Sequence, residues 1–355
     1  MASIILTTRC NLHCPYCFAS GFVNREKSDI SITHFLQAVS FITRTESSVS
    51  LIGGEPTIHP GFQTIMDLLI ANPRVNNVNL FTNNIFSDQY IPQMTHPKVT
   101  VIVNCNSPLD VGKEIYARFQ QNLDLLFRHC SRTNQIHLGF NLYSDSMDYS
   151  YMLDLLKRYS LRTVRTSLTV PDFSSYTDVN VLDYFRKRKK SLLNLFRDLD
   201  HIQVMAFMDC NHPPYCIWTE EEKEWLKSYI SRCGLRNDRL IDCCSPCSPD
   251  VTIYPDLQAD RCYGMSDYMK VPISEYKDIP DLIRFFANEM DAVAYKLPAD
   301  GECRNCQEWR ARRCLGGCIG YKSSRIRAAN KAIDRFNPDS PYHPGCMCRK
   351  AGTIP

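Results

Sequence analysis

Three cysteines close to the amino terminus have the spacing of a metal-binding loop. Cys10, Cys14 and Cys17 form a C-x3-C-x2-C motif. Three thiolates from one loop can bind three irons of a cubane iron–sulfur cluster and leave the fourth iron without a protein ligand. A zinc knuckle is the alternative, with His13 as a fourth ligand, but His13 adjoins Cys14 and the chelate would be strained. The spacing therefore predicts a cluster with one open iron.

A second segment able to bind a ligand is Gly53-Gly54-Glu55-Pro56-Thr57. Two glycines let a backbone come close to a ligand, and the Glu55 carboxylate can accept hydrogen bonds from an ammonium group. Taken alone, the segment would more often be an ordinary strand-to-helix turn. Its position one βαβ unit after the cysteine loop favours ligand binding.

Cysteines gather again in the last third of the chain, which holds ten of the 18 between Cys243 and Cys348. They are Cys243, Cys244, Cys247, Cys262, Cys303, Cys306, Cys314, Cys318, Cys346 and Cys348. Short fixed spacings in a long chain are typical of metal sites rather than disulfides. Two four-cysteine zinc sites are the alternative to iron–sulfur clusters. Thiolate ligation requires a reducing compartment, so we expect a cytoplasmic protein.

The first two-thirds of the chain alternates short apolar runs with amphipathic ones. Candidate strands are residues 3–8, 49–52, 78–82, 99–104, 135–141, 163–168 and 203–208. Candidate helices are residues 32–43, 62–71, 88–94, 113–130, 150–159 and 176–200. Such alternation predicts right-handed βαβ units around a parallel sheet. About six units suit an α/β fold, a partial (β/α)6 barrel with its active site at the carboxyl ends of the strands.

The alternating pattern ends near Cys210. We predict a core domain over residues 1–209, a bridging region over 210–240 with a helix at 219–232, and a cysteine-rich domain over 241–355. The last of these contains a short hairpin at 250–262 and needs metal to fold. The chain has no apolar run of transmembrane length or signal peptide, and a net charge of +3 gives no argument for nucleic acid.

The two amino-terminal segments closely resemble the radical S-adenosylmethionine (SAM) superfamily. The resemblance implies that SAM chelates the open iron and is cleaved to a 5′-deoxyadenosyl radical. It also implies that the segment Gly53–Pro56, with Glu55, binds the SAM amino group and that the backbone of Tyr16 contacts adenine. Candidates for ribose and carboxylate contacts at the strand ends are Asn104, Asn106, Asn141 and Arg165.

The later cysteines resemble the SPASM extension of that superfamily, which carries two auxiliary [4Fe–4S] clusters, so three clusters are expected. The resemblance gives the first auxiliary cluster Cys243 or Cys244 with Cys247, Cys262 and Cys318. It gives the second Cys303, Cys306 and Cys314 with Cys346 or Cys348. Leu257 departs from the family, which usually has Gly there. The pair Cys210-x5-Cys216 is a rival source of ligands for the first auxiliary cluster.

The SPASM resemblance implies hydrogen abstraction from a peptide or protein, leading to a cross-link or an oxidised residue. Expected partners are the peptide, a separate peptide-recognition protein, and an electron donor such as flavodoxin or ferredoxin. Tyr263 stands where the sulfatase-maturating branch has an acid, so formylglycine formation is not expected. The candidate catalytic residues are Tyr263, Asp209 and Asp267.

Two other functions are weighed against peptide modification. One is dehydrogenation or rearrangement of a small metabolite. The other is a non-catalytic metal-binding protein, against which the Gly53–Pro56 segment argues. The basic run Arg186–Lys190 is interpreted as a solvated helix face. The arginines at 304, 310, 312 and 313 leave open a groove for an acidic peptide or a phosphate-rich partner.

Overall fold

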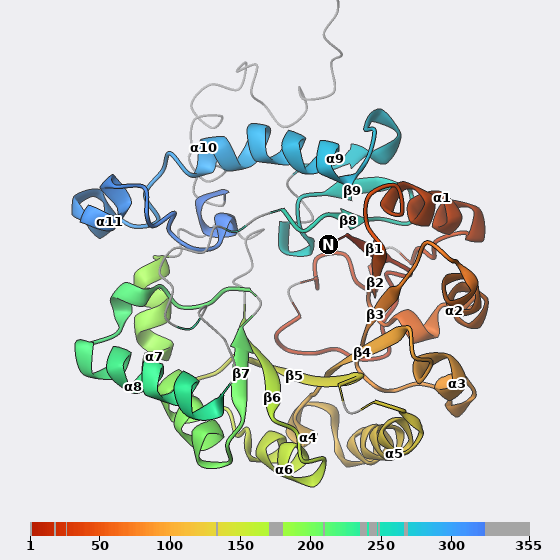
Figure 1. Cartoon of the computed structure of the whole chain (residues 1–355), viewed down its shortest axis with the longest axis horizontal. Coiled ribbons are helices and arrows are strands. Elements are labelled where there is room, and N and C mark those ends of the chain that lie inside the picture. The colour runs from red at the N-terminus through yellow and green to blue at the C-terminus, as the bar shows by residue number, and fades with distance from the viewer. Residues whose placement is uncertain are drawn as a thin grey trace, which may run out of the picture.

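The protein is described by a computed structural model that covers residues 2–17, 19–25, 27–132, 134–169, 180–208, 210–234, 240, 247, 249–265 and 269–323. Within these residues the centre of the fold is one sheet in the order β10-β9-β8-β1-β2-β3-β4-β5-β6-β7. Figure 1 shows the strands curving in an arc with the helices outside it. This is the predicted α/β partial barrel.

The first seven strands pair in parallel, each with the next along the chain. They are β1 Ser3–Ile5, β2 Ser48–Ile52, β3 Asn77–Thr82, β4 Val99–Asn104, β5 Ile136–Leu142, β6 Thr163–Leu168 and β7 Met205–Met208. The predicted positions are confirmed, with differences at the ends. Gln203, predicted to open β7, instead has a left-handed backbone (φ 56°) that ends the preceding helix.

Except for α4, which was not predicted, the helices that accompany these strands lie close to their predicted positions. They are α1 Ile32–Ile42, α2 Phe62–Ala71, α3 Ile91–Met94, α4 Pro108–Val111, α5 Lys113–His129, α6 Ser150–Arg158, α7 Val181–His201 and α8 Glu220–Cys233. Ser31 caps α1 by accepting a hydrogen bond from the His34 amide. The helix predicted over 88–94 is a 3₁₀ turn, Asp88–Tyr90, followed by the single turn of α3. The predicted start of α7 at residue 176 lies outside the described residues.

The two faces of the sheet differ in burial. In β4, Val99, Val101 and Val103 are buried, whereas Thr100, Ile102 and Asn104 between them are only partly buried. Successive side chains of a strand point to opposite faces, so one face packs against the helices and the other lines the inside of the arc. Polar side chains on the inner face are therefore available to a ligand.

The cysteine-rich region continues the same sheet on the other side of β1. The predicted hairpin is present as β8 Thr252–Ile253 and β9 Gln258–Asp260, which pair antiparallel, and β10 Val271–Pro272 follows. Strand β8 pairs in parallel with β1. The hairpin is followed by α9 Ile279–Phe286, α10 Ala292–Ala294 and α11 Gln307–Arg310, with α9 and α10 beside it in Figure 1.

The hairpin turn holds a bulky residue in an unusual conformation. Leu257 has φ 65°, in the left-handed region that favours glycine, and its amide donates to the Tyr254 carbonyl at 2.9 Å. This is the position at which the resembling family usually has Gly. No helix of the described residues combines the length and apolar character needed to cross a bilayer.

Candidate active site

The three amino-terminal cysteines follow β1 at the carboxyl edge of the sheet. Their thiols lie close enough to raise one another's pKa: Cys14 is influenced by both Cys10 and Cys17. Burial is the larger cause, raising the pKa of Cys10 to about 11 and that of Cys14 to about 12. The loop therefore brings three sulfurs to one place.

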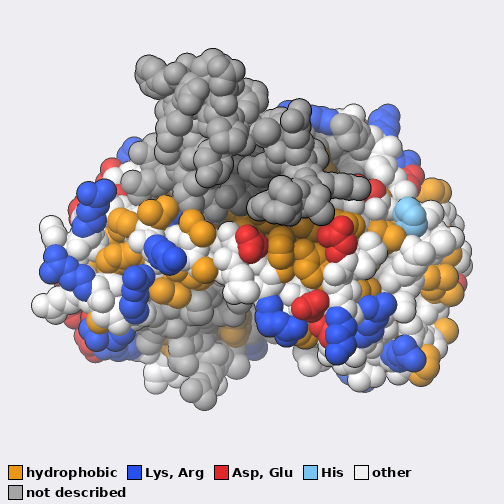
Figure 2. All heavy atoms as spheres, turned by 90° about the horizontal axis from the view of Figure 1, so that it is seen from above, with side chains coloured by type: hydrophobic (Ala, Val, Ile, Leu, Met, Phe, Trp, Pro, Cys, Tyr) orange, Lys and Arg blue, Asp and Glu red, His pale blue; other side chains and the backbone are white. Residues whose placement is uncertain are grey.

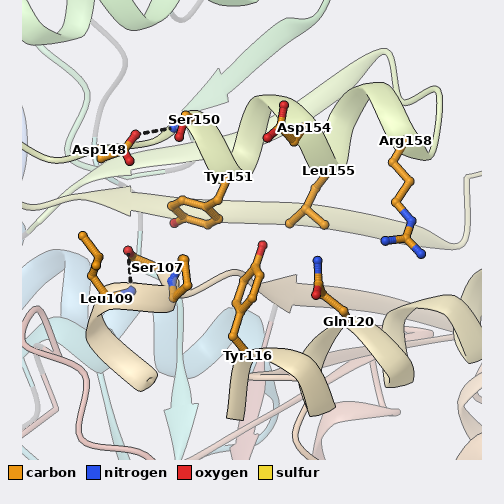
Figure 3. A pocket seen from close by; sticks show the side chains of 11 residues that line it. Ser107, Leu109, Tyr116, Gln120, Asp148, Ser150, Tyr151, Asp154, Leu155 and Arg158 are labelled. Carbon is orange, nitrogen blue, oxygen red and sulfur yellow. Dashed lines mark hydrogen bonds between the residues drawn. The ribbon is translucent and has the colours of Figure 1, made fainter. Parts of the chain in front are cut away.

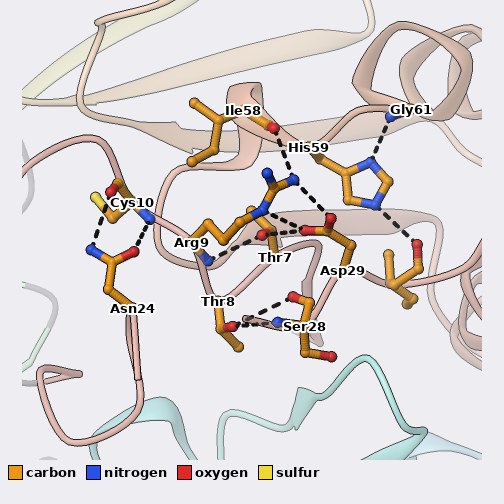
Figure 4. Close-up of polar contacts among 11 residues, drawn as sticks. Thr7, Thr8, Arg9, Cys10, Asn24, Ser28, Asp29, Ile58, His59 and Gly61 are labelled. Carbon is orange, nitrogen blue, oxygen red and sulfur yellow. Dashed lines mark hydrogen bonds and ion pairs between the residues drawn. The ribbon is translucent and has the colours of Figure 1, made fainter. Parts of the chain in front are cut away.

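A returning segment of chain fixes the backbone of Cys10. The Asn24 side chain accepts from the Cys10 amide at 2.8 Å and donates to its carbonyl at 3.1 Å (Figure 4). Asn24 has φ 61°, a conformation that Asn tolerates. On the other side of the loop, Arg9 forms an ion pair with Asp29, at 2.7 Å, and donates to the Ile58 carbonyl. These contacts hold the loop in one conformation.

One backbone amide of this loop and one side chain from the end of β3 point at the Cys10 sulfur. The Leu12 amide donates to it at 3.4 Å, and the Asn83 side chain lies 3.9 Å from it. Such donors stabilise a thiolate ligand and tune an iron–sulfur cluster. Among the described residues, no three His, Cys, Asp or Glu side chains converge on a point that could hold a single metal ion. A donor set made only of sulfur suits a cubane, which takes one thiolate on each iron.

The two glycines after β2 allow two backbones to touch. A Cβ on Gly53 would lie 2.4 Å from the Thr7 carbonyl oxygen, and one on Gly54 would lie 2.0 Å from that of Arg9. The Gly54 amide donates to the Thr7 carbonyl at 2.9 Å. Glycine is thus required here to pack the predicted SAM segment against the cysteine loop. Whether its backbone also contacts SAM stays a prediction.

Glu55 is buried and fully engaged by neighbouring donors. Its Oε1 accepts from the Thr57 amide (3.1 Å), the Thr57 hydroxyl (2.7 Å) and the Thr82 hydroxyl (2.8 Å), and its Oε2 accepts from the Asn83 amide at 2.7 Å. Burial raises the pKa of Glu55, although these hydrogen bonds oppose the shift. Oε2 carries one hydrogen bond and retains acceptor capacity for a cation.

The predicted SAM contacts on the strand ends form one connected polar chain. The Tyr16 hydroxyl donates to Asn106 and accepts from Asn104 at 2.8 Å. Asn141 donates to Asn104 at 3.1 Å and accepts from Ser167. The chain crosses the carboxyl ends of β4, β5 and β6, where a barrel enzyme places its ligands.

Arg165, the remaining predicted SAM contact, lies elsewhere on the inner face. Its guanidinium lies over the Phe81 ring at 5.7 Å, and its charge acts on the Cys210 thiol. Arg165 is therefore positioned between the strand-end polar chain and the cysteine-rich region.

Tyr263 links the hairpin to the predicted SAM segment. Its hydroxyl donates to the Gly53 carbonyl at 2.8 Å, and the charges of Cys17 and Cys10 act on it. Burial raises its pKa well above the ordinary value, so the phenol is neutral. Asp209 and Asp267, the other catalytic candidates, lie outside the described residues.

A group of four cysteines surrounds the base of the hairpin. The Cys318 thiol is within hydrogen-bonding reach of Cys210 and Cys247, and Cys262 interacts with both of those thiols. Arg261 is fully buried, donates toward the Cys247 sulfur at 3.5 Å, and is paired with Asp291.

A second cysteine group lies near α11. Cys303 interacts electrostatically with Cys314 and Cys306, and Cys216 interacts with all three. Cys216, predicted as a rival ligand for the first auxiliary cluster, is thus placed beside the other group. The remaining predicted ligands, Cys243, Cys244, Cys346 and Cys348, lie outside the described residues.

Two basic residues of α7, Arg186 and Lys189, are paired with carboxylates. Arg186 bonds Glu302 through two contacts of 2.8 Å, and Lys189 pairs with Glu222 at 2.5 Å. Near α11, basic side chains gather at the left edge of the face in Figure 2. The exposed arginines in and beside α11 are Arg304, Arg310, Arg312 and Arg313. Arg313 pairs with Glu308 at 2.7 Å, so part of this charge is already compensated.

A cavity of about 290 Å³ lies on the helical layer, between α4–α5 and α6 (Figure 3). Tyr116 and Tyr151 approach one another edge to face across it, with ring centroids 6.3 Å apart. Asp154 and Arg158 also line it. None of the predicted site residues lies in its wall, and it is separate from the cysteine loop.

Sequence reasoning missed several residues of this site. Asn24, Asn83 and Ser167 each contact a predicted residue. Ser167 could have been found, because it lies two positions after Arg165 on the same face of a strand. Asn24 had no such signal, since only the folded loop returns it to Cys10.

Comparison with known families gives a match over more than half of the chain. Residues 4–195 match the Radical SAM superfamily. Two curated relatives are a molybdenum cofactor biosynthesis protein of Caenorhabditis elegans and a GTP 3′,8-cyclase of Peptoclostridium acidaminophilum. Both are 30% identical, over 102 and 94 residues, or 28% and 26% of this chain. The matched segments span only 17% and 29% of those relatives.

Solved structures are similar over nearly the whole chain at low sequence identity. A structure of anSMEcpe with bound AdoMet has a TM-score of 0.62 and 14% identity, covering 96% of this chain and 100% of that one. Streptococcus suis SuiB bound to its precursor peptide SuiA has a TM-score of 0.56 and 14% identity, covering 89% and 71%. These likenesses show that the fold is shared.

Proposed function

The chain belongs to the radical SAM superfamily, and from that premise we propose that it abstracts hydrogen from a peptide or protein substrate to modify it. The observation that carries this proposal is the cysteine loop packed against the Gly53–Glu55 segment. With an external electron donor, a cluster and SAM bound there would supply the reductive cleavage of SAM to methionine and a 5′-deoxyadenosyl radical.

The described residues have distinct roles in this proposal. Cys10, Cys14 and Cys17 hold the cluster. Glu55 accepts from the SAM ammonium group through Oε2, while four hydrogen bonds from Thr57, Thr82 and Asn83 fix its position. The chain from Tyr16 to Ser167 orients the nucleoside part by its amides and hydroxyls.

The two further cysteine groups are proposed to bind auxiliary [4Fe–4S] clusters. Each group is described with four sulfurs, so each iron of a cubane would have a thiolate and none would be open to substrate. Such clusters would transfer electrons, and the segments that hold them would form part of the substrate pocket. Thiolate ligation calls for a reducing compartment, and an external donor such as flavodoxin or ferredoxin is needed to supply the electrons.

A peptide or protein substrate is supported by structural neighbours that were solved with bound peptides and are similar to most of this chain. The SuiB complex contains a precursor peptide, and a second structure of anSMEcpe contains the Kp18Cys peptide. Their similarity extends over 89% and 95% of this chain, including its cysteine-rich part. A partner that presents the peptide, distinct from this chain, is compatible with the proposal.

A second candidate function is cyclisation or rearrangement of a small metabolite. It is favoured by the 30% identity to GTP 3′,8-cyclases, which is higher than that to the peptide-modifying neighbours. That match covers about a quarter of the chain, so it concerns the shared chemistry more than the substrate.

The radical step is tested by replacing Cys10, Cys14 and Cys17 with Ala. We expect 5′-deoxyadenosine formation from SAM and dithionite to disappear under anaerobic conditions, because no cluster remains to bind SAM. Cys130→Ala is the matched control, since Cys130 belongs to neither cysteine group and caps α5. Persistence of cleavage in the triple variant would show that the cysteine roles are wrong.

The substrate class is tested by mass spectrometry after anaerobic turnover. Candidate peptides encoded near the gene and GTP are offered separately to the same reconstituted enzyme. We expect a mass change in a peptide and none in the nucleotide. A modified nucleotide with unmodified peptides would favour the metabolite function.

A further inference from the structure

We infer that the two cysteines of the Cys210-x5-Cys216 pair ligate different auxiliary clusters, Cys210 the first and Cys216 the second. The inference rests on the proposed function, because it presupposes that both cysteine groups bind clusters. It departs from the resemblance, which takes the fourth ligand of the second cluster from Cys346 or Cys348. It also removes the need for Cys243 or Cys244 in the first.

The first group is complete with Cys210. The Cys318 thiol is within hydrogen-bonding reach of both Cys210 and Cys247, and the charges of those two thiols act on Cys262. The four sulfurs come from three separate places in the chain: the end of β7, the two ends of the hairpin, and the last cysteine of the C-x2-C-x7-C-x3-C run. Four thiolates are what a [4Fe–4S] cluster takes.

Asn211, the residue after Cys210, anchors that cysteine in place. Its side chain donates to the carbonyls of Leu168 and Thr169, at 3.2 and 3.3 Å, and accepts from the Tyr321 hydroxyl at 2.9 Å. Asn211 is 4% exposed and has φ 51°. Because Tyr321 follows Cys318 by three residues, the same side chain ties the end of β6 to the segment that carries Cys318.

The second group is complete with Cys216. Cys216 lies in the 3₁₀ turn Tyr215–Ile217, and its thiol interacts with Cys303, Cys314 and Cys306. Three of these four sulfurs come from the run around α11, and Cys216 adds the fourth from the barrel side. Five residues of chain lie between Cys210 and Cys216, enough to let the two thiols serve neighbouring sites.

An ion pair brings the two segments of the second group together. Arg186 on α7 bonds both carboxylate oxygens of Glu302, the residue before Cys303, at 2.8 Å each. The charge of Cys216 acts on the same guanidinium. Arg186 therefore stands at the junction of the barrel and the cysteine run, where a bidentate pair fixes orientation as well as distance.

Positive charge at the second group matches an anionic cluster. Lys322 is 1% exposed and donates a hydrogen bond to the Leu315 carbonyl. Its ammonium group interacts electrostatically with the thiols of Cys314 and Cys303. Its ammonium group lies 4.9 Å from the centre of the Trp309 ring. A buried ammonium is costly without a compensating anion, and a cubane held by four thiolates supplies one.

The test uses the full chain with Cys10, Cys14 and Cys17 replaced by Ala, so that only auxiliary clusters contribute iron. This background should hold about eight irons, two cubanes of four. Adding Cys216→Ala should remove up to half of the iron or convert one cubane to a three-iron cluster with a new electron paramagnetic resonance signal when oxidised. Adding Cys346→Ala with Cys348→Ala should leave iron content and spectrum unchanged.

The first cluster is tested in the same background. Cys210→Ala should change the iron content and Mössbauer spectrum, whereas Cys243→Ala with Cys244→Ala should not. Cys130→Ala is the control for cysteine loss, and circular dichroism identifies any variant that fails to fold. Because Cys210 and Cys216 are exposed, their replacement leaves no cavity in the core, and Cys216→Ser gives a second reading through a shifted spectrum with iron retained.

Two outcomes would overturn the inference: an unchanged spectrum in Cys216→Ala or Cys210→Ala, or an equal change in either of the double variants. A background chain that binds zinc or no metal would instead refute the auxiliary clusters themselves. The proposed function is tested separately, with the unaltered chain. If that chain forms no 5′-deoxyadenosine, the proposed radical step is wrong, whereas the ligand assignment is decided by the iron content and spectra of the variants.

Discussion

At Glu55, one buried carboxylate serves both the fold and the proposed ligand. Four hydrogen bonds from Thr57, Thr82 and Asn83 fill most of its acceptor capacity. Removing the carboxylate would leave those donors unpaired inside the protein, which destabilises by more than the bonds themselves contribute. Loss of SAM binding in a Glu55 variant therefore needs a control that separates the two roles.

Thr82→Val supplies that control, because it removes one donor to Glu55 and keeps the carboxylate. We expect it to lower the free energy of unfolding by about 1–2 kcal/mol and to change SAM affinity only a few-fold. Glu55→Ala should weaken SAM binding at least tenfold. Equilibrium dialysis with SAM and denaturant unfolding measure the two effects. Equal losses of affinity in both variants would contradict a direct contact between Glu55 and SAM.

His59 predicts a pH dependence of stability. Its Nε2 donates to the Ile30 carbonyl at 2.9 Å and its Nδ1 accepts from the Gly61 amide at 2.9 Å (Figure 4), so the ring is neutral. Burial lowers its pKa from 6.5. Because the folded protein binds this proton less tightly than the unfolded chain, the contribution is full above pH 6.5 and is lost as pH falls through the lowered pKa.

We expect His59→Asn, which keeps an acceptor for Gly61, to flatten the loss of stability between pH 7 and pH 5 by at most about 1.4 kcal/mol per pH unit. Urea unfolding at each pH measures it. His96→Asn is the matched control, since His96 makes the same type of bond to the Lys98 amide from a half-buried site. An unchanged slope in His59→Asn would mean that another group titrates.

Among the secondary-structure elements, the β8–β9 hairpin carries a backbone conformation that its sequence does not favour. Leu257 has φ 65° and packs partly against the core. A left-handed backbone costs a non-glycine residue about 1–2 kcal/mol, and a β-branched residue more. The contacts of the leucine side chain offset this cost.

The stability of Leu257 variants should depend on how easily the new residue adopts a left-handed backbone, rather than on its hydrophobicity. Leu257→Gly is expected to stay within about 1 kcal/mol of the unaltered chain, since strain relief offsets lost packing. Leu257→Ile should lose about 1–2 kcal/mol despite its equal size. Thermal unfolding measures both. If Ile is tolerated and Gly is not, packing rather than conformation decides this position.

Predictability from the sequence varied with the kind of element. The strands and most helices followed from apolar periodicity, which is local information. The continuous helix predicted over 88–94 is not formed, because Pro92 has no amide hydrogen to donate to the Asp88 carbonyl and is accepted only in the first turn of α3. The predicted strand-end residues Asn104 and Asn141 are joined with Tyr16 of the cysteine loop in one polar chain, because strand ends of a parallel sheet share an edge. Their contacts with SAM stay predictions.

The partners of Cys216 could not be foreseen, because no local pattern links residue 216 with residues 303–314. The C-x5-C spacing suggested that both cysteines of the pair serve one site. Only the course of the chain after β7, held by Asn211 and by the Arg186–Glu302 pair, places the two thiols at different groups.

At the scale of the whole molecule, the barrel and the cysteine-rich region share one sheet. Strand β8 pairs with β1, and the Ser3 amide donates to the Val251 carbonyl at 2.8 Å. Figure 1 shows β8 and β9 beside β1, at the opposite side of that strand from β2. The predicted division at residues 209 and 240 therefore separates segments of the chain that are joined by backbone hydrogen bonds.

A chain that ends after Gly234 should aggregate. Without β8, the backbone N–H and C=O groups of Ser3 and Ile4 have no partner on that side of β1. An unpaired strand edge can pair with another molecule. A chain that ends after Ser323 keeps β8–β10 and is the matched control, expected to elute like the full chain. Size-exclusion chromatography with light scattering compares them. Equal solubility of both truncations would show that β8 does not protect β1.

The pairing of β1 with β8 also has a consequence during translation. The first strand leaves the ribosome about 250 residues before its second neighbour has been made, an interval of about 12–50 s at 5–20 residues per second. During that time one edge of β1, Ser3–Ile5, has no partner strand in the nascent chain. The nascent chain is therefore a target for chaperones that bind exposed strands.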